Sequence, residues 1–189
     1  VEANAKIMQL RSQEAAEIER ILEAFTNQIA SMEQMFLFGY SCMLDIDVLL
    51  AKAKLALAQN ATMPAVTEEG WFCLNKARHP LIDPEKVVPI DVALGKEYDT
   101  MVITGPNTGG KTVTLKTAGL LCAMAQHGLL IPAQAGSTVC HFADYLVDIG
   151  DEQSIEQSLS TFSGHIRNIV EILDKAAPNT LVLLSLIHI

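Results

Sequence analysis

The spacing of apolar residues divides the chain into two parts of different character. From about residue 3 to residue 59 there is no proline and only one glycine. Apolar residues recur there at alternating steps of four and three: Ile18, Leu22, Phe25, Ile29, Met32 and Phe36. This heptad spacing is typical of a helix that packs along another helix. It predicts an all-α helical arm, which we assign to residues 1–62.

Two interpretations of this heptad stripe remain open, a true coiled coil and an ordinary amphipathic core helix. Gly39 is expected to interrupt the arm, because glycine weakens a helix. A second helix is then predicted over residues 45–58, ending before Asn60 and Pro64.

Beyond Pro64 the pattern changes to short apolar runs separated by turns and by longer helical stretches. The runs predict strands at 71–74, 100–104, 129–131, 145–149 and 180–184. Helical spacing predicts helices at 113–127 and 155–176. Strands that alternate with helices indicate an α/β domain with a mostly parallel sheet, which we assign to residues 63–189.

Composition narrows the class of protein. With 189 residues, half of them hydrophobic, the chain can bury one substantial core. A net charge of −9 argues against a nucleic-acid surface spread over this segment, because phosphate contacts need clustered Lys and Arg. The four cysteines are far apart and favour reduced thiols over a zinc site or disulfides. We expect no signal peptide, no apolar run of membrane-spanning length and a cytoplasmic location.

Residues 105–112 match the phosphate-loop pattern G-x-x-x-x-G-K-[ST] between a predicted strand and a predicted helix. In such a loop, glycines let backbone N–H groups face the phosphates at a helix N-terminus, whose dipole favours anions. Lys111 is predicted to neutralise the β- and γ-phosphates, and the Thr112 hydroxyl to hold Mg²⁺. We therefore expect ATP or ADP with Mg²⁺, bound by Gly105, Pro106, Asn107, Thr108, Gly109, Gly110, Lys111, Thr112 and Val113.

The loop has a narrower form, Pro-Asn-x-Gly-Gly, that resembles the MutS family of ABC-type ATPases. Further segments carry the same resemblance in the same order: Arg78-His79-Pro80, Ile131-Pro132-Ala133, residues 148–153 and residues 158–162. Residues 111–117 and 151–162 are similar to the bacterial MutS type-two branch, and residues 44–53 match it loosely. The resemblance covers nearly the whole chain.

This resemblance implies a P-loop (ABC-type) ATPase sheet with helices, preceded by the helical arm. It implies a homodimer formed through the ATPase domain, whose ATP binding and hydrolysis move arms clamped on nucleic acid. The partner would be DNA or a ribosome, held mostly by regions outside this chain, with no membrane. Recombination control, rescue of stalled ribosomes and a nuclease module outside this chain are the associated roles.

The resemblance also makes Ser160 the signature serine, which acts on the nucleotide of the opposite subunit. Hydroxyl residues crowd the predicted helix start there and can receive an anion, although ordinary helix capping explains the same residues. Two further groups are ambiguous. Asp148, Asp151 and Glu152 form either a metal cluster or, as we favour, solvated loop carboxylates before a helix. His79 either faces the nucleotide or is a structural loop histidine.

The chain departs from the family after residues 181–184, where the family continues with the acidic Walker B pair. Ser185 and Leu186 stand there instead, and the tail to Ile189 fits no part of the pattern. We expect a truncation at the Walker B strand and nucleotide binding without hydrolysis. The alternative function is a non-hydrolysing nucleotide-binding or dimerisation module. A P-loop kinase is excluded, because the Pro-Asn-x-Gly-Gly loop and the Ser-Thr-Phe segment have no reason to occur together in one.

Overall fold

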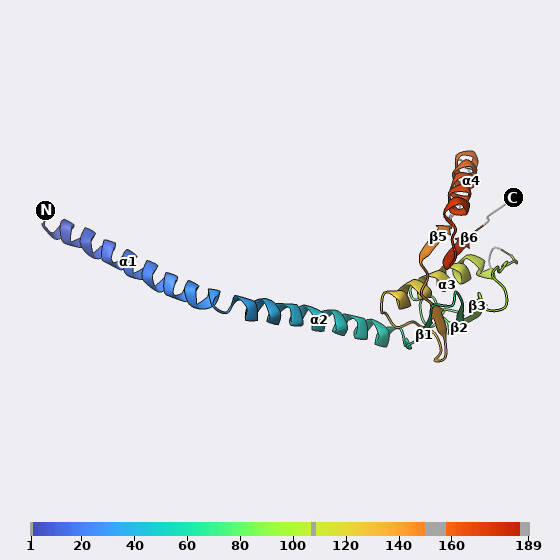
Figure 1. The fold of residues 1–189 in the computed structure, drawn as a ribbon, viewed down its shortest axis with the longest axis horizontal. Coiled ribbons are helices and arrows are strands. Elements are labelled where there is room, and N and C mark those ends of the chain that lie inside the picture. The colour runs from blue at the N-terminus through green and yellow to red at the C-terminus, as the bar shows by residue number, and fades with distance from the viewer. Residues whose placement is uncertain (1, 107–108, 150–157, 186–189) are drawn as a thin grey trace. The chain divides into compact units, whose positions relative to one another are not determined.

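A computed structural model describes residues 2–106, 109–149 and 158–185, without the side chains of residues 158–163. The chain forms two compact units, Val1–Ala51 and Lys52–Ile189 (Figure 1). In chain order the elements are α1 (Glu2–Ala30), α2 (Glu33–Ala58), β1 (Ala65–Thr67), β2 (Phe72–Ala77), β3 (Ile90–Leu94), α3 (Lys111–Gln126), β4 (Thr138–Cys140), β5 (Asp144–Asp148), α4 (Ser158–Lys175) and β6 (Thr180–Leu184).

The helical arm breaks at residues 31–32 and not at Gly39, which lies inside α2. The Ser31 hydroxyl donates to the carbonyl of Gln28 at 2.7 Å and so competes with the regular helix ladder. A lone glycine costs a helix only about 1 kcal/mol, which the rest of α2 tolerates. The second helix consequently begins at Glu33 and not near Asp45.

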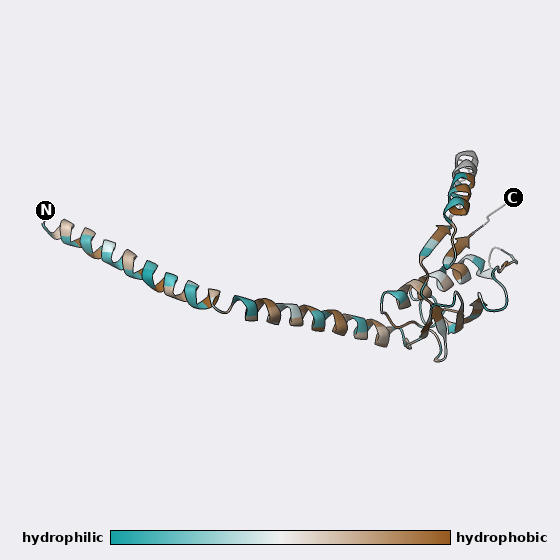
Figure 2. Ribbon diagram, in the orientation of Figure 1, coloured by the Kyte–Doolittle hydropathy of each residue, from teal (hydrophilic) through white to brown (hydrophobic). Residues whose placement is uncertain are grey.

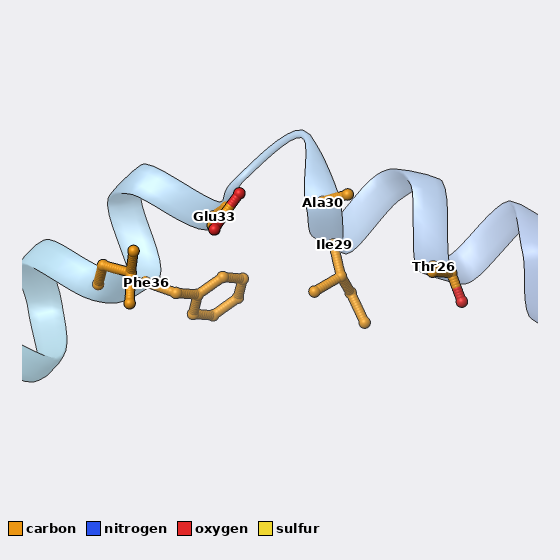
Figure 3. A pocket seen from close by; sticks show the side chains of 6 residues that line it. Thr26, Ile29, Ala30, Glu33 and Phe36 are labelled. Atoms are coloured by element: carbon orange, nitrogen blue, oxygen red, sulfur yellow. The ribbon is translucent and has the colours of Figure 1, made fainter.

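The heptad stripe of the arm is exposed in the first unit. Its residues are exposed between 39% for Met32 and 59% for Leu22 and Ile29. An open hollow of about 440 Å³ lies at the helix break, and Ile29 and Phe36 point to the same side of it (Figure 3). The apolar stripe therefore continues across the break.

The α2 helix is long and apolar enough to cross a membrane by length and composition (Figure 2). The expectation that no apolar run reaches spanning length is wrong by these two criteria. The core helix of a soluble protein meets the same criteria. This feature alone therefore does not assign the chain to a membrane.

The last turns of α2 belong to the second unit and are tied to it by hydrogen bonds. The Lys52 ammonium donates to the carbonyl of His127 at the end of α3, at 3.2 Å. The Arg78 guanidinium donates to the carbonyls of Gln59 and Asn60, at 3.0 and 2.9 Å. Both cations meet carbonyls at or just beyond a helix C-terminus, where positive charge is favourable.

The strands form two separate sheets. The larger has the order β1-β4-β2-β3, in which β2 runs antiparallel to both β3 and β4 and only β1 and β4 are parallel. The smaller is the parallel pair β5-β6. The expected mostly parallel arrangement is therefore confirmed for β5-β6 and wrong for the larger sheet. No helix crosses between β2 and β3, and antiparallel strands need none.

The predicted strands at 71–74, 145–149 and 180–184 correspond to β2, β5 and β6, and both predicted helices are present as α3 and α4. Residues 100–104 are not a strand: no described strand pairs with them, and Val102 is 80% exposed. Residues 129–131 supply only an isolated bridge between Thr62 and Ile131. An apolar run becomes a strand only where a neighbour accepts its backbone hydrogen bonds.

One face of α3 is buried against both sheets, since this helix contacts β2, β4 and β6. Leu121 and Cys122 are fully buried in this core, and burial raises the pKa of the Cys122 thiol to about 12. A side chain at Gly119 would place its Cβ 2.3 Å from Leu183 of β6. The absence of a side chain therefore lets α3 lie close to β6.

We predict that Leu121→Ala lowers the free energy of unfolding by about 2–5 kcal/mol, because it opens a cavity where α3 meets the sheets. Leu57→Ala is the matched control, since Leu57 is also helical but 79% exposed. The control should change the free energy by no more than about 0.5 kcal/mol. Urea denaturation measures both. Equal effects for the two variants would contradict the assignment of Leu121 to the core.

Candidate functional site

The phosphate-loop sequence leads directly into α3. Gly110 precedes the helix with φ 74°, and Gly105 has φ 145°. Both angles lie in the region that favours glycine, and a Cβ at either residue would meet no atom within 4 Å. Backbone conformation, and not crowding, therefore explains these glycines. Because the N-cap residue Gly110 has no side chain, it cannot cap the N–H groups of the first turn of α3.

Lys111 is the first residue of α3 and folds back over the loop. Its Nζ donates to the carbonyl of Gly105 at 2.5 Å and to that of Pro106 at 2.9 Å. The Gly109 N–H donates to the Pro106 carbonyl at 2.9 Å and closes the turn. The ammonium thus lies against the loop within which a phosphate would bind. Asn107 and Thr108 fall outside the described residues.

Thr112 is half-buried in the first turn of α3, and the next residue, Val113, is 40% exposed. Among the described residues no three His, Cys, Asp or Glu side chains gather as metal ligands. In the described part of the chain, an Mg²⁺ ion at this loop would have the Thr112 hydroxyl as its protein ligand, beside phosphate oxygens and water. Such a set is usual for Mg²⁺, which keeps several waters when bound to phosphates.

The acidic set predicted between β5 and α4 is corrected at Asp148. We expected a solvated loop carboxylate there, but Asp148 ends β5 and is only 7% exposed. It is buried because the alternation of β5 turns its side chain inward. Asp151 and Glu152 lie outside the described residues, so the metal-cluster alternative is untested.

Sequence reasoning missed the partners of Asp148. The Nδ1 atom of His165 lies 3.0 and 2.9 Å from its two carboxylate oxygens, and Asn168 Nδ2 donates to Oδ1 at 3.3 Å. His165 and Asn168 lie one helical turn apart on α4. That spacing, together with an acid at the end of an apolar strand, was the available signal.

The backbone of Asp148 makes a further contact. Its carbonyl accepts a hydrogen bond from the N–H of Ser185 at 2.9 Å, just beyond the end of β6. Ser160 lies in the first turns of α4, its side chain outside the described part, and Leu186 is not described at all. The structure thus brings Asp148 and Ser185 together at one end of the parallel pair.

His79 lies in the loop after β2. Its Nδ1 accepts a hydrogen bond from the N–H of Leu81 at 3.3 Å. Burial, and then the positive charge of Lys116 on α3, hold the pKa of His79 below its ordinary value. The contact with Leu81 gives His79 a structural role in its loop, and its proximity to α3 leaves the nucleotide-facing role open as well.

Comparison with known proteins places these features in context. A family model for MutS domain V matches residues 101–187. The protein named endonuclease MutS2 of Caldicellulosiruptor bescii is 50% identical over 98% of this chain and 24% of its own length. The MutS2 proteins of Caldanaerobacter subterraneus and Bacillus cytotoxicus are 52% and 51% identical over 98% and 97% of the chain. The chain spans about a quarter of the length of these relatives.

We predict that Lys116→Met raises the pKa of His79, because it removes the positive charge that disfavours the imidazolium. Titration of the His79 ring signals by NMR measures the shift. Lys86→Met is the control, since Lys86 pairs instead with Asp83. An unchanged His79 pKa in Lys116→Met would show that burial alone lowers it.

The sign of the linked stability follows from the lowered pKa. The unfolded chain binds a proton at His79 more readily than the folded chain does. The contribution of His79 is therefore present above pH 6.5 and is lost as the pH falls from there toward the folded pKa. Lys116→Met should weaken this loss.

Proposed function

The chain belongs to the MutS family, and from that premise we propose that it is the ATP-binding part of a MutS-like, DNA-associated ATPase. The observation that carries the proposal is the position of the Lys111 ammonium over the glycine loop at the N-terminus of α3. This arrangement offers a cation and helix N–H groups to one anion.

Nucleotide binding would replace contacts that the loop makes with itself. Lys111 would exchange the carbonyls of Gly105 and Pro106 for β- and γ-phosphate oxygens, which form stronger charge-assisted hydrogen bonds. The proposed binding residues are those of the loop from Gly105 to Val113. Mg²⁺, when bound, would neutralise phosphate charge, and the Thr112 hydroxyl would hold it.

The finer assignments rest on the family. We propose residues 1–62 as the helical arm and 63–189 as the ATPase domain of a cytoplasmic homodimer. Ser160 would then act on the nucleotide of the partner subunit. DNA or a ribosome would be held mainly outside this chain, in agreement with its net charge of −9.

Hydrolysis needs a carboxylate that positions the attacking water. Ser185 and Leu186 have none, and the Asp148 carboxylate is already engaged by His165 and Asn168. We propose that this 189-residue chain binds nucleotide without turning it over. The second candidate is a non-hydrolysing nucleotide-binding or dimerisation module. It is favoured by Ser185 and Leu186, which lack carboxylates, and it would describe the parent protein as well.

We predict that Lys111→Ala weakens ATP binding ten- to a hundredfold, or by about 1.5–3 kcal/mol, because it removes a charge-assisted contact to phosphate. Isothermal titration calorimetry with ATP and Mg²⁺ measures the affinity. Lys86→Ala is the control, because Lys86 is exposed and pairs with Asp83 away from the loop. Equal affinities of the wild type and Lys111→Ala would overturn the loop assignment.

We further predict that the wild-type chain releases no phosphate from ATP above the rate of Lys111→Ala. A coupled phosphate-release assay measures both. Ser185→Asp combined with Leu186→Glu should restore turnover only when the natural sequence that follows in the parent gene is also present. Lys111-dependent release by the unmodified chain would show that another carboxylate positions the water.

A further inference from the structure

We propose that Asp148, His165 and Asn168 are positioning residues that fix the orientation of the first turns of α4. These turns carry Ser160, so the functional consequence rests on the proposed function. The three side chains form one contact between the end of β5 and α4, in which Asp148 is buried while the His165 side chain is 33% exposed and Asn168 lies at the exposed edge. Both oxygens of Asp148 lie 2.9–3.0 Å from His165 Nδ1, and Asn168 adds a bond of 3.3 Å.

The remaining contacts of α4 leave its orientation weakly determined. Among the described elements, α4 has its main contact with β5. Its buried anchor is Ile172, at 8% exposure, while Ile166, Val170 and Leu173 are 46–70% exposed. Apolar burial is non-directional, whereas hydrogen bonds are directional. The Asp148 contact therefore decides how the half of α4 that precedes Ile172 is rotated and tilted.

Asp148 also connects α4 to the end of β6. Its carbonyl accepts the Ser185 N–H at 2.9 Å, and Asp148 pairs in register with Leu184 of β6. One residue therefore holds α4 through its side chain and the end of β6 through its backbone. The first turns of α4 would keep a fixed relation to the strand end where the family carries its acidic pair.

A buried carboxylate is costly unless its oxygens are hydrogen-bonded. Among the described side chains, loss of His165 would leave Asp148 with Asn168, and the helix would be expected to move or the carboxylate to draw in water. Asparagine at position 165 can still place an amide N–H₂ near the position of Nδ1. His165→Asn is thus the conservative variant that separates a specific hydrogen bond from general packing.

Hydrogen–deuterium exchange of the full 189-residue chain tests the positioning role. The relevant amides are those of residues 162–166, which are the first in α4 that can donate to a carbonyl of the same helix. The N–H groups of residues 158–161 have no partner within the helix and are not used. We expect His165→Ala to accelerate their exchange at least tenfold while amides of β6 keep the wild-type rate. His165→Asn should restore most of the protection. Arg167→Ala, a neighbouring exposed residue on α4, should have no effect.

Unchanged exchange at residues 162–166 in His165→Ala would overturn the proposal, as would an equal effect of Arg167→Ala. A double variant, Asp148→Asn with His165→Ala, should be no worse than His165→Ala alone, because the two residues act as a pair. Additive effects would show that they act independently and would also overturn it.

Sedimentation velocity with ATP and Mg²⁺ tests the functional consequence separately. His165→Ala should weaken ATP-promoted dimerisation at least fivefold, while calorimetry shows an unchanged ATP affinity at the loop. Full dimerisation of His165→Ala would overturn the link to Ser160. A wild-type chain that stays monomeric with ATP would contradict the proposed homodimer, and the exchange data would still decide the positioning role.

Discussion

The second unit depends on the burial of one face of α3. The larger sheet and the β5-β6 pair are not hydrogen-bonded to each other in the described residues, and α3 contacts both. Its buried residues Ala118, Leu121 and Cys122 supply the shared core. The same helix begins at Lys111, so the contact that holds the two sheets together also fixes the base of the glycine loop.

The elements predicted well from the sequence are those with long or strongly apolar patterns. The helices α3 and α4 and the strands β5 and β6 fall within a few residues of their predicted ranges. The strands β1, β3 and β4 were missed; β1 and β4 have only three residues, which show no usable period. The run at 100–104 has strand-like composition, yet pairing depends on a neighbouring backbone that composition does not reveal. The break at residues 31–32 is accompanied by a side-chain bond of Ser31, which the apolar pattern does not reveal.

The candidate site shows the same division between local and distant information. The loop from Gly105 to Thr112 could be predicted because its chemistry lies within eight consecutive residues. The contact of Asp148 with His165 left only a weak signal, the spacing of His165 and Asn168 after an acid that ends an apolar run, because its members are separated along the chain and meet through the packing of α4 on β5. An acidic residue at the end of an apolar run is predicted to be solvated. Only the structure of β5 shows that Asp148 lies on the buried face of the strand.

Gly119 sets how closely α3 and β6 can approach, because it has no Cβ. A Leu183 methyl group occupies the space that a Cβ at residue 119 would need. The glycine lies about two helical turns from Lys111, on the helix that also touches the strand before Ser185. A side chain at residue 119 would therefore force Leu183 into another rotamer or move α3 away from β6, so the spacing between the helix of the glycine loop and the strand before Ser185 depends on a residue that has no functional group.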